Sequence, residues 1–112
     1  MTNSRAFVAV AFEPMAAIIE NTTFTLRPGV ASRDFLAADA EVQTDFAYQQ
    51  PGCVRRTTAS NDAGEYLVVE VWQTAEHADQ RRSEAANSSA MTKLMSLIDA
   101  ESIRVSRYRT VE

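Results

Sequence analysis

The sequence predicts an α+β protein of the ferredoxin-like, split βαβ class, with the element order β-α-β-β-α-β and an antiparallel sheet. Segments rich in β-branched and aromatic residues alternate with segments whose apolar residues recur at helical spacing, and turn-forming residues separate them. The length of 112 residues corresponds to one domain. We place that domain at residues 18–112, after an N-terminal arm or extra strand at residues 1–17.

The first half of the domain is predicted to be a strand followed by a helix. The strand spans residues 18–27, which are rich in isoleucine, threonine and phenylalanine, and the turn-forming pair Pro28-Gly29 ends it. Ser32 then offers an N-cap for a helix over residues 32–48, which Pro51-Gly52 stops. The apolar stripe of this helix consists of Phe35, Ala38, Val42 and Phe46.

A hairpin is predicted in the middle of the chain. Residues 54–60 alternate weakly between polar and apolar and indicate a short strand, whereas residues 66–73 have the clearest strand pattern in the chain. The intervening residues 61–64 have the composition of a turn, in which Gly64 is expected to take a positive φ.

The second half ends with an interrupted helix and a last strand. Thr74 is expected to cap the helix, which pauses at residues 87–89 because Asn and Ser side chains compete with the hydrogen bonds of a helix. Residues 103–111 are predicted to form the last strand. The apolar stripe of the resumed helix is Met91, Leu94, Met95 and Ile98.

The third predicted strand has two different faces, because successive side chains point to opposite sides of a sheet. We expect its aliphatic face, Leu67, Val69 and Val71, to pack against the helices. The other face would then be uncovered in a monomer, and monomers rarely expose such an apolar patch. We therefore predict a homodimer in which two sheets pair face to face. The face expected to be buried in this way carries Tyr66, Val68, Glu70 and Trp72.

Composition argues against several classes of function. The net charge is −4, from 15 acidic and 11 basic residues, and this disfavours a nucleic-acid partner. A single cysteine, Cys53, cannot form an intramolecular disulfide, and with a single histidine, His77, it argues against a metal site of the zinc type. Three glycines in total are too few for a phosphate-binding loop.

The sequence also argues against a membrane segment. The apolar run at residues 6–12 is interrupted by Glu13 and Pro14 and lacks the pattern of a signal peptide. No stretch approaches the roughly 18 apolar residues of a membrane span. We therefore expect no membrane partner and a cytoplasmic location.

Four segments together resemble the dimeric α/β-barrel superfamily, and within it the antibiotic-biosynthesis-monooxygenase-like branch. These segments are residues 23–30 (TFTLRPGV), 35–38 (FLAA), 50–52 (QPG) and 68–74, the last of which contains Trp72. The resemblance covers about residues 18–108. It implies a homodimer whose two sheets form a barrel, with a pocket between the sheet and the helices of each protomer. Members of the superfamily include cofactor-free oxygenases of polyphenolic quinone precursors and haem-degrading proteins.

The haem-degrading activity of this superfamily does not fit the chain. Its pattern requires an asparagine on the first strand, a tryptophan at the end of the third and a histidine about three helical turns later. Trp72 matches, but Asn21 is one residue out of register and His77 follows Trp72 by only five residues. The axial histidine is missing, so we reject haem degradation and expect no cofactor.

The candidate catalytic residues are Glu70 and Trp72. Trp72 could stack on a ligand or only fill the barrel, and these interpretations are about equally supported. A carboxylate among aromatic side chains could act as a general base. Alternatively, Glu70 forms an ion pair with an arginine of the last strand, Arg107 or Arg109, and we favour this second interpretation.

The remaining pocket candidates come from the face of the third strand and from the resemblance. The quinone-forming branch uses an asparagine, a tryptophan, a tyrosine and an arginine around its pocket, which implies Trp72 and suggests further partners. The ligand-pocket candidates are Asn21, Phe24, Tyr66, Val68 and Arg107. A band of arginines is expected on the second and fourth strands, and most of these side chains are expected to be solvated or to form ion pairs with another chain. The alternative is that the band binds an acidic or quinone-like ligand. It consists of Arg55, Arg56, Arg104, Arg107 and Arg109.

Two other reactive residues are expected to play structural roles. His77 falls in the first turn of the second helix, where it would be solvated or contribute to the cap, and Cys53 is expected to be a buried small hydrophobe.

The resemblance implies a cofactor-independent monooxygenase that acts on an aromatic compound of the phenol or quinone type. The alternative is a non-catalytic module of the same fold that binds a small molecule or mediates dimerisation. Isomerisation or decarboxylation on the same fold is a third possibility, because one fold supports many reactions.

Overall fold

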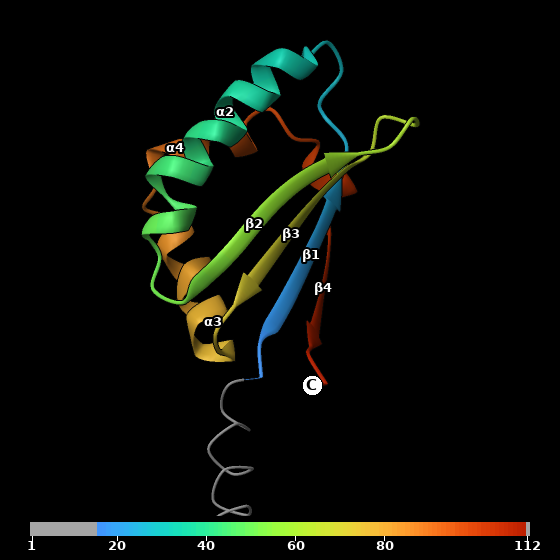
Figure 1. Cartoon of the computed structure of the whole chain (residues 1–112). Helices are drawn as coiled ribbons and strands as arrows, with labels where there is room; N and C mark the ends of the chain where they lie inside the picture. Colours follow the sequence, from blue (N-terminus) through green and yellow to red (C-terminus); the bar gives the residue numbers. More distant parts are fainter. Residues whose placement is uncertain (1–15, 112) are drawn as a thin grey trace, which may run out of the picture.

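The computed structural model describes residues 16–111, which form a four-stranded antiparallel sheet with α-helices packed on one of its faces (Figure 1). The order of the strands across the sheet is β2-β3-β1-β4. The predicted α+β, ferredoxin-like arrangement is confirmed. The strands are β1 (Ile18–Phe24), β2 (Cys53–Ser60), β3 (Tyr66–Trp72) and β4 (Arg104–Arg109).

The helix between β1 and β2 is α2 (Ser32–Asp45), and a 3-10 turn at Ala47–Gln49 follows it. The predicted Ser32 cap is wrong. Ala31 occupies the N-cap position without a side-chain hydrogen bond, and the Ser32 hydroxyl accepts a hydrogen bond from the Tyr66 hydroxyl at 3.0 Å. This tertiary contact uses the side chain that the local sequence marked as a cap.

The predicted interruption of the second helix is confirmed, since α3 (Ala75–Ala85) and α4 (Ser89–Met95) are separate helices. The Thr74 hydroxyl accepts a hydrogen bond from the backbone N–H of His77, as the cap prediction required. Ser88 caps α4 in the same way, accepting from the N–H of Met91. A 3-10 turn at Ala100–Ser102 then leads into β4.

The hairpin between β2 and β3 also agrees with the sequence. The Asn61 side-chain oxygen accepts hydrogen bonds from the N–H groups of Ala63 and Glu65, each at 3.0 Å. Gly64 has φ of 82°, which an L-residue rarely adopts, and so the predicted positive φ is confirmed.

The predicted assignment of the two faces of β3 is wrong. The side chains of Tyr66, Val68, Glu70 and Trp72 are buried beneath the helices. The side chains of Leu67, Val69 and Val71 are half-buried and point to the uncovered side of the sheet. The helices cover the mixed face because its aromatic side chains fill the core and arginines balance its carboxylate.

An aromatic cluster marks the centre of this core. The rings of Phe24 and Tyr66 stack with centroids 5.9 Å apart, and Phe35 from α2 packs against both, at 5.5 and 4.5 Å. Aliphatic residues of α4, including Met91 and Leu94, continue the same cluster. A second, smaller cluster joins Trp72 to Ile18 and to Ala78 of α3.

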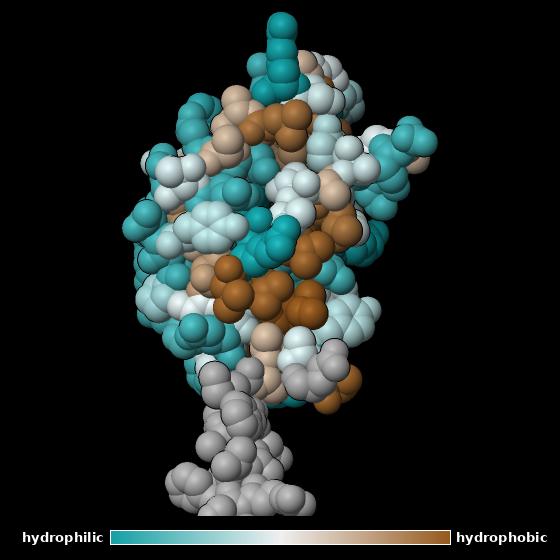
Figure 2. Space-filling model, in the orientation of Figure 1, coloured by the Kyte–Doolittle hydropathy of each residue, from teal (hydrophilic) through white to brown (hydrophobic). Residues whose placement is uncertain are grey.

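The uncovered face of the sheet is still apolar. The register places Ile19 of β1 between Val71 of β3 and Tyr108 of β4 on this face. Tyr108 is 58% exposed, and Figure 2 shows hydrophobic side chains gathered over the strands. The argument for a homodimer therefore applies to this face and not to the one that carries Glu70.

The predicted arm or extra strand at residues 1–17 lies outside the described residues except for its last two. Ala17 continues the pairing of β1 with β4, because its N–H donates to the Thr110 hydroxyl and its carbonyl accepts from the Thr110 N–H, both at 2.9 Å. Within residues 16–111, no helix is both long and apolar enough to cross a membrane.

Candidate active site

A cavity of about 160 Å³ lies between the covered face of the sheet and the helices. Side chains of β1, β3 and β4 form the wall on the sheet side, and side chains of α4 form the opposite wall. The wall is apolar apart from two arginines and a threonine. The lining residues are Thr22, Phe24, Arg56, Val68, Arg81, Met91, Leu94, Met95, Ile98, Ile103 and Val105.

Arg56 of β2 is the more rigidly held of the two arginines. Its side chain is 2% exposed, and its Nη2 donates to Oδ1 of Asp39 on α2 at 2.7 Å. Its Nη1 donates to Gln43 and Thr58, both at 3.4 Å. The Thr58 hydroxyl in turn donates to the other Asp39 oxygen at 2.7 Å. A buried charge needs such partners, and here both Nη groups have them.

Glu70 lies between Arg56 and Arg81. Its side chain is 4% exposed, with Oε2 3.6 Å from Nε of Arg56 and Oε1 3.5 Å from Nε of Arg81. These are ion-pair distances, but the geometry is too loose for hydrogen bonds. Both Nε groups and Glu70 Oε2 have no hydrogen-bond partner among the described residues.

The expected ion pair of Glu70 with Arg107 or Arg109 is wrong in its partners. Strand β1 lies between β3 and β4, and β2 is the strand that places Arg56 directly opposite Glu70. Arg81 reaches the carboxylate from α3. The ion-pair interpretation of Glu70 therefore holds with two different arginines.

Arg107 belongs to a second group of charges. It donates to Oε2 of the buried Glu20 at 2.7 Å and to Asp79 of α3 at 2.8 Å, and Arg82 also donates to Glu20, at 3.2 Å. The hydrogen bonds to Asp79 and Glu20 raise the pKa of Arg107 above its ordinary value. Arg107 does not line the cavity.

The predicted band of arginines does not form. β2 and β4 are opposite edges of the sheet, so their arginines are separated by two strands. Arg56 and Arg107 point to the covered face, where each pairs with a carboxylate. Arg55 and Arg104 are exposed and lie on the other face.

The structure brings only part of the predicted site together. Phe24 and Val68 line the cavity, while Glu70 lies behind the two arginines that do. Tyr66 is on the same face but is engaged in the aromatic cluster and with Ser32. Asn21 is on the opposite face, paired with Val69 and Ser106.

Trp72 is fully buried and does not line the cavity. It packs against Ile18 and Ala78, and its indole Nε1 has no hydrogen-bond partner among the described residues. Its contacts are those of a core residue at the end of β3.

Arg81 was missed by the sequence reasoning, and Arg56 was placed in the band and not in a pocket. A local signal for Arg56 exists, because opposite charges often face each other across antiparallel strands, and Arg56 pairs directly with Glu70. Arg81 has no such signal, since its contact with Glu70 depends on how α3 packs.

Cys53 and His77 have structural surroundings. Burial, and next the charge of Glu70, raise the pKa of the Cys53 thiol, which makes it a poor nucleophile at neutral pH. The His77 ring packs on Gly52, where any Cβ would collide with it, and Nδ1 lies 2.8 Å from the Thr74 hydroxyl. His77 thus belongs to the helix cap, as expected.

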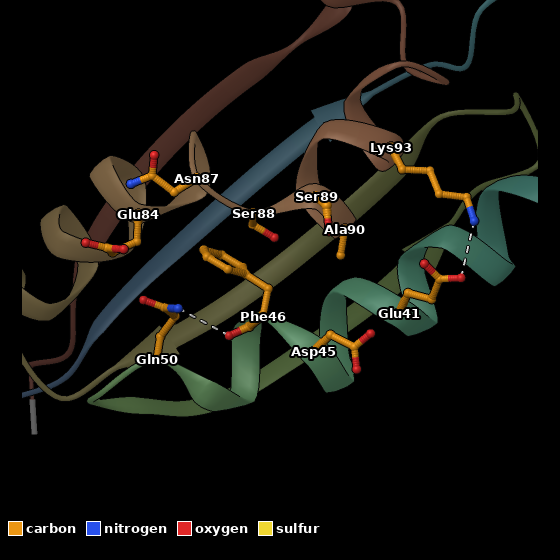
Figure 3. Close-up of a pocket in the computed structure, with 10 residues that line it drawn as sticks. All are labelled: Glu41, Asp45, Phe46, Gln50, Glu84, Asn87, Ser88, Ser89, Ala90 and Lys93. Atoms are coloured by element: carbon orange, nitrogen blue, oxygen red, sulfur yellow. Dashed lines mark hydrogen bonds and ion pairs between the residues drawn. The ribbon is translucent and has the colours of Figure 1, made fainter.

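Two surface grooves accompany the cavity. One, of about 380 Å³, shares Arg81, Met91 and Met95 with it. The other, of about 470 Å³, lies between the end of α2 and the junction of α3 with α4 (Figure 3). Its polar side chains include the ion pair of Lys93 with Glu41 at 3.2 Å. Residues 16–111 contain no cluster of three or more histidine, cysteine or acidic side chains that could hold a metal ion.

Comparisons with known proteins agree with this fold. A family model described as antibiotic biosynthesis monooxygenase matches residues 17–93. SnoaB, a cofactor-independent oxygenase from Streptomyces nogalater, superposes with a TM-score of 0.72 at 18% identity, covering 87% of this chain and 95% of that one. No curated protein matches the chain.

Two further solved structures have the same fold. A Bordetella bronchiseptica protein, assigned provisionally as an antibiotic biosynthesis monooxygenase, gives a TM-score of 0.72 at 20% identity, covering 87% of this chain and 99% of that one. A conserved protein from Methanosarcina mazei Go1 gives 0.67 at 16% identity, covering 89% and 98%.

Proposed function

Because the chain belongs to the antibiotic biosynthesis monooxygenase family, we propose that it is a cofactor-independent monooxygenase of a small phenol. The observation that supports this most is the cavity between sheet and helices, which is apolar except at two arginines and a threonine. An apolar enclosure with a few convergent polar groups is the usual form of a small-molecule site. The likeness to a cofactor-independent oxygenase, SnoaB, supports the same class of reaction.

The proposed reaction uses the phenol itself as the reductant. The phenol loses its proton to solvent water at the open side of the cavity. The phenolate forms a bond from its para carbon to dioxygen, and the resulting peroxide takes up a proton from water. Loss of water from this hydroperoxide leaves a quinone. One phenol and one dioxygen thus give one quinone and one water, and dioxygen is the only oxidant required.

In this proposal, Arg56 and Arg81 favour the ionised form of the phenol. Positive charges that the protein holds in place stabilise a developing oxyanion without the reorganisation that water requires. Both arginines line the cavity, and both are held by carboxylates that do not line it. The positive groups therefore face the ligand and the negative groups lie behind them.

Glu70 is proposed as a positioning residue for these two arginines. A general base must reach the proton directly or through one water. Glu70 does not line the cavity, and its contacts at 3.5 and 3.6 Å are with the guanidinium groups. Trp72 is proposed to support the end of β3 from the core, because its surroundings are entirely protein.

The proposal is tested by oxygen consumption with a panel of phenols of one, two and three rings, followed by product analysis. We expect a quinone from at least one phenol, and a loss in Arg81→Gln of about tenfold or more. The matched control is Arg33→Gln, which changes an exposed arginine of α2 that lines neither the cavity nor the groove beside it. Folded protein that consumes no oxygen with any phenol would overturn the proposal.

Variants of Glu70 and Trp72 separate their proposed roles from direct catalysis. Glu70→Gln is expected to raise KM more than it lowers kcat, because it loosens both arginines that bind the phenol. A direct base would instead lower kcat and shift its pH profile. Trp72→Phe is expected to keep kcat within a few-fold, and a loss on the order of 100-fold would assign Trp72 to the chemistry.

The alternative function is a non-catalytic module that binds a small molecule or mediates dimerisation. It is supported by the uncovered apolar face of the sheet, with Ile19, Val69 and Val71 half-buried in the single chain. We propose that this face pairs with a second copy of the chain, with or without the oxygenase reaction. We also propose that the protein is cytoplasmic.

A further inference from the structure

The volume of the cavity matches about one aromatic ring. The cavity measures about 160 Å³, and an engineered protein cavity of about 150 Å³ holds one benzene molecule. Sites for larger ligands are usually about 300–1,000 Å³. The walls on the sheet side are strand residues such as Phe24 and Val68, which are nearly fully buried. The cavity is open on one side, where Met95 and Val105 are 41% and 53% exposed, so about one ring of a ligand can be held inside it.

Arg81 is the group on the cavity wall with hydrogen-bond donors to spare. Its side chain is 19% exposed, and its Nε lies 3.5 Å from Glu70 without a hydrogen bond. None of residues 16–111 accepts a hydrogen bond from its Nη groups. Its guanidinium carbon lies 5.9 Å from the centroid of the Phe46 ring. Arg56 differs, because both of its Nη groups have acceptors.

The distribution of charge around the cavity favours a ligand with a negative group. The ionisable side chains that line it are Arg56 and Arg81, both positive. The balancing carboxylates, Asp39 and Glu70, contact those arginines and are not on the cavity wall. A planar guanidinium with free Nη donors matches a carboxylate through two parallel hydrogen bonds.

We propose that the cavity takes a single-ring phenol that also carries a carboxylate, and that Arg81 binds the carboxylate and so determines specificity. Arg56, whose Nε has no hydrogen-bond partner among the described residues, then lies nearer the phenol oxygen. This inference rests on the proposed function only in placing the ligand in this cavity. The ring packs against Phe24, Val68 and Leu94, and the carboxylate lies at the end where Arg81 meets the neighbouring groove.

Calorimetric binding of three probes to the full chain tests this inference. The probes are 4-hydroxybenzoate, its neutral analogue 4-hydroxybenzamide, and anthracene-2-carboxylate, which carries the same charge on three rings. We expect 4-hydroxybenzoate to bind more tightly than the amide by on the order of tenfold, because a charge-assisted pair replaces a neutral one. We expect anthracene-2-carboxylate to bind more weakly than 4-hydroxybenzoate.

Variants on α3 identify the residue responsible. Arg81→Gln is expected to bind the benzoate and the amide equally, whereas Arg33→Gln on α2, which lines neither the cavity nor the groove and is confirmed as folded by circular dichroism, retains the preference. Arg81→Lys keeps the charge without the planar fork and is expected to retain only part of the preference. These two variants of Arg81 keep the inference testable if one of them fails to fold.

Three results would overturn the inference: equal binding of the benzoate and the amide by the natural chain, an undiminished preference in Arg81→Gln, or tighter binding of the three-ring acid. The proposed oxygenase can fail separately. Binding of 4-hydroxybenzoate without oxygen consumption by any phenol would support this inference and contradict the monooxygenase. Turnover of neutral phenols alone would support the monooxygenase and contradict the carboxylate specificity.

Discussion

Glu70 carries a buried charge whose partners come from two different elements. The carboxylate lies between Arg56 of β2 and Arg81 of α3 at 3.6 and 3.5 Å. Removing one member of a buried ion pair is costly because the remaining charges are left in a medium that solvates them poorly. The residue therefore contributes to the stability of the fold as well as to the position of both arginines.

Glu70→Gln is expected to lower the free energy of unfolding by about 3 kcal/mol, because it leaves buried guanidinium charge uncompensated. Urea denaturation followed by circular dichroism measures the change. The matched control is Glu41→Gln, whose ion pair with Lys93 is on the surface, with side chains 48% and 59% exposed. That control is expected to cost less than about 1 kcal/mol, and equal effects of the two variants would contradict the prediction.

Cys53 is half-buried, and its surroundings favour the neutral thiol over the thiolate. Burial and the neighbouring charge of Glu70 raise its thiol pKa, so less thiolate is present at a given pH than in an exposed cysteine. We expect iodoacetamide at pH 8 to alkylate the native chain more slowly than the urea-unfolded chain. Equal rates would contradict the raised pKa.

The same shift has a consequence for stability. A group whose pKa is higher in the folded state contributes stability that is present below its unfolded pKa and is lost as the pH rises through the folded value. The contribution of Cys53 is therefore expected to decline only in alkaline solution. Comparing the pH dependence of urea unfolding with that of Cys53→Ser measures this contribution.

Helix α3 is attached to the sheet mainly by charge. Ala78 is its only buried residue, whereas three of its side chains form ion pairs with the sheet. These pairs are Arg81 with Glu70, Arg82 with Glu20, and Asp79 with Arg107. By contrast, α2 buries Phe35, Ala38 and Val42. The two helices differ in what holds them to the sheet, so they should respond differently to salt.

We expect 0.5 M NaCl to increase amide hydrogen exchange in α3 more than in α2, because salt weakens ion pairs whose side chains are exposed to solvent. Asp79 and Arg82 are 63% and 60% exposed, so their pairs are the most accessible to screening. Asp79→Asn should reproduce part of the increase at low salt. Equal changes in both helices, measured by mass spectrometry, would contradict this account of α3.

At the scale of the whole described structure, residues 16–111 place their helices on one side of the sheet and none on the other (Figure 1). The uncovered side retains Ile19, Leu67, Val69 and Val71 as half-buried apolar residues. Burying such a face against its copy would remove it from water, which is the dominant favourable contribution to association. The symmetry of a two-fold dimer brings the same face from each copy together.

Val69→Asp is therefore expected to shift the chain from dimer to monomer at micromolar concentration, because it would bury two carboxylates across the two-fold axis. Light scattering coupled to size exclusion measures the mass. The control Leu36→Asp places the same charge on the exposed side of α2, where Leu36 is 52% exposed. A natural chain that is monomeric under these conditions would contradict the dimer.

Local sequence determined the features that depend on neighbouring residues. The order of strands and helices, the Thr74 cap, the interruption at residues 87–89 and the positive φ of Gly64 all follow from propensities that operate within a few residues. Each of these was predictable because the interaction that decides it spans one turn of chain or less.

Tertiary structure alone decided which face of β3 the helices cover and which arginines reach Glu70. The alternation of side chains separates Leu67 and Val69 from Tyr66 and Glu70, but it does not say which set is inside. That choice depends on Arg81, Arg56 and Phe35, which come from three other elements, α3, β2 and α2. The family resemblance implied a pocket between the sheet and the helices. The charged wall of that pocket could not be predicted, because its ion pairs and ring contacts form only when the sheet and helices pack.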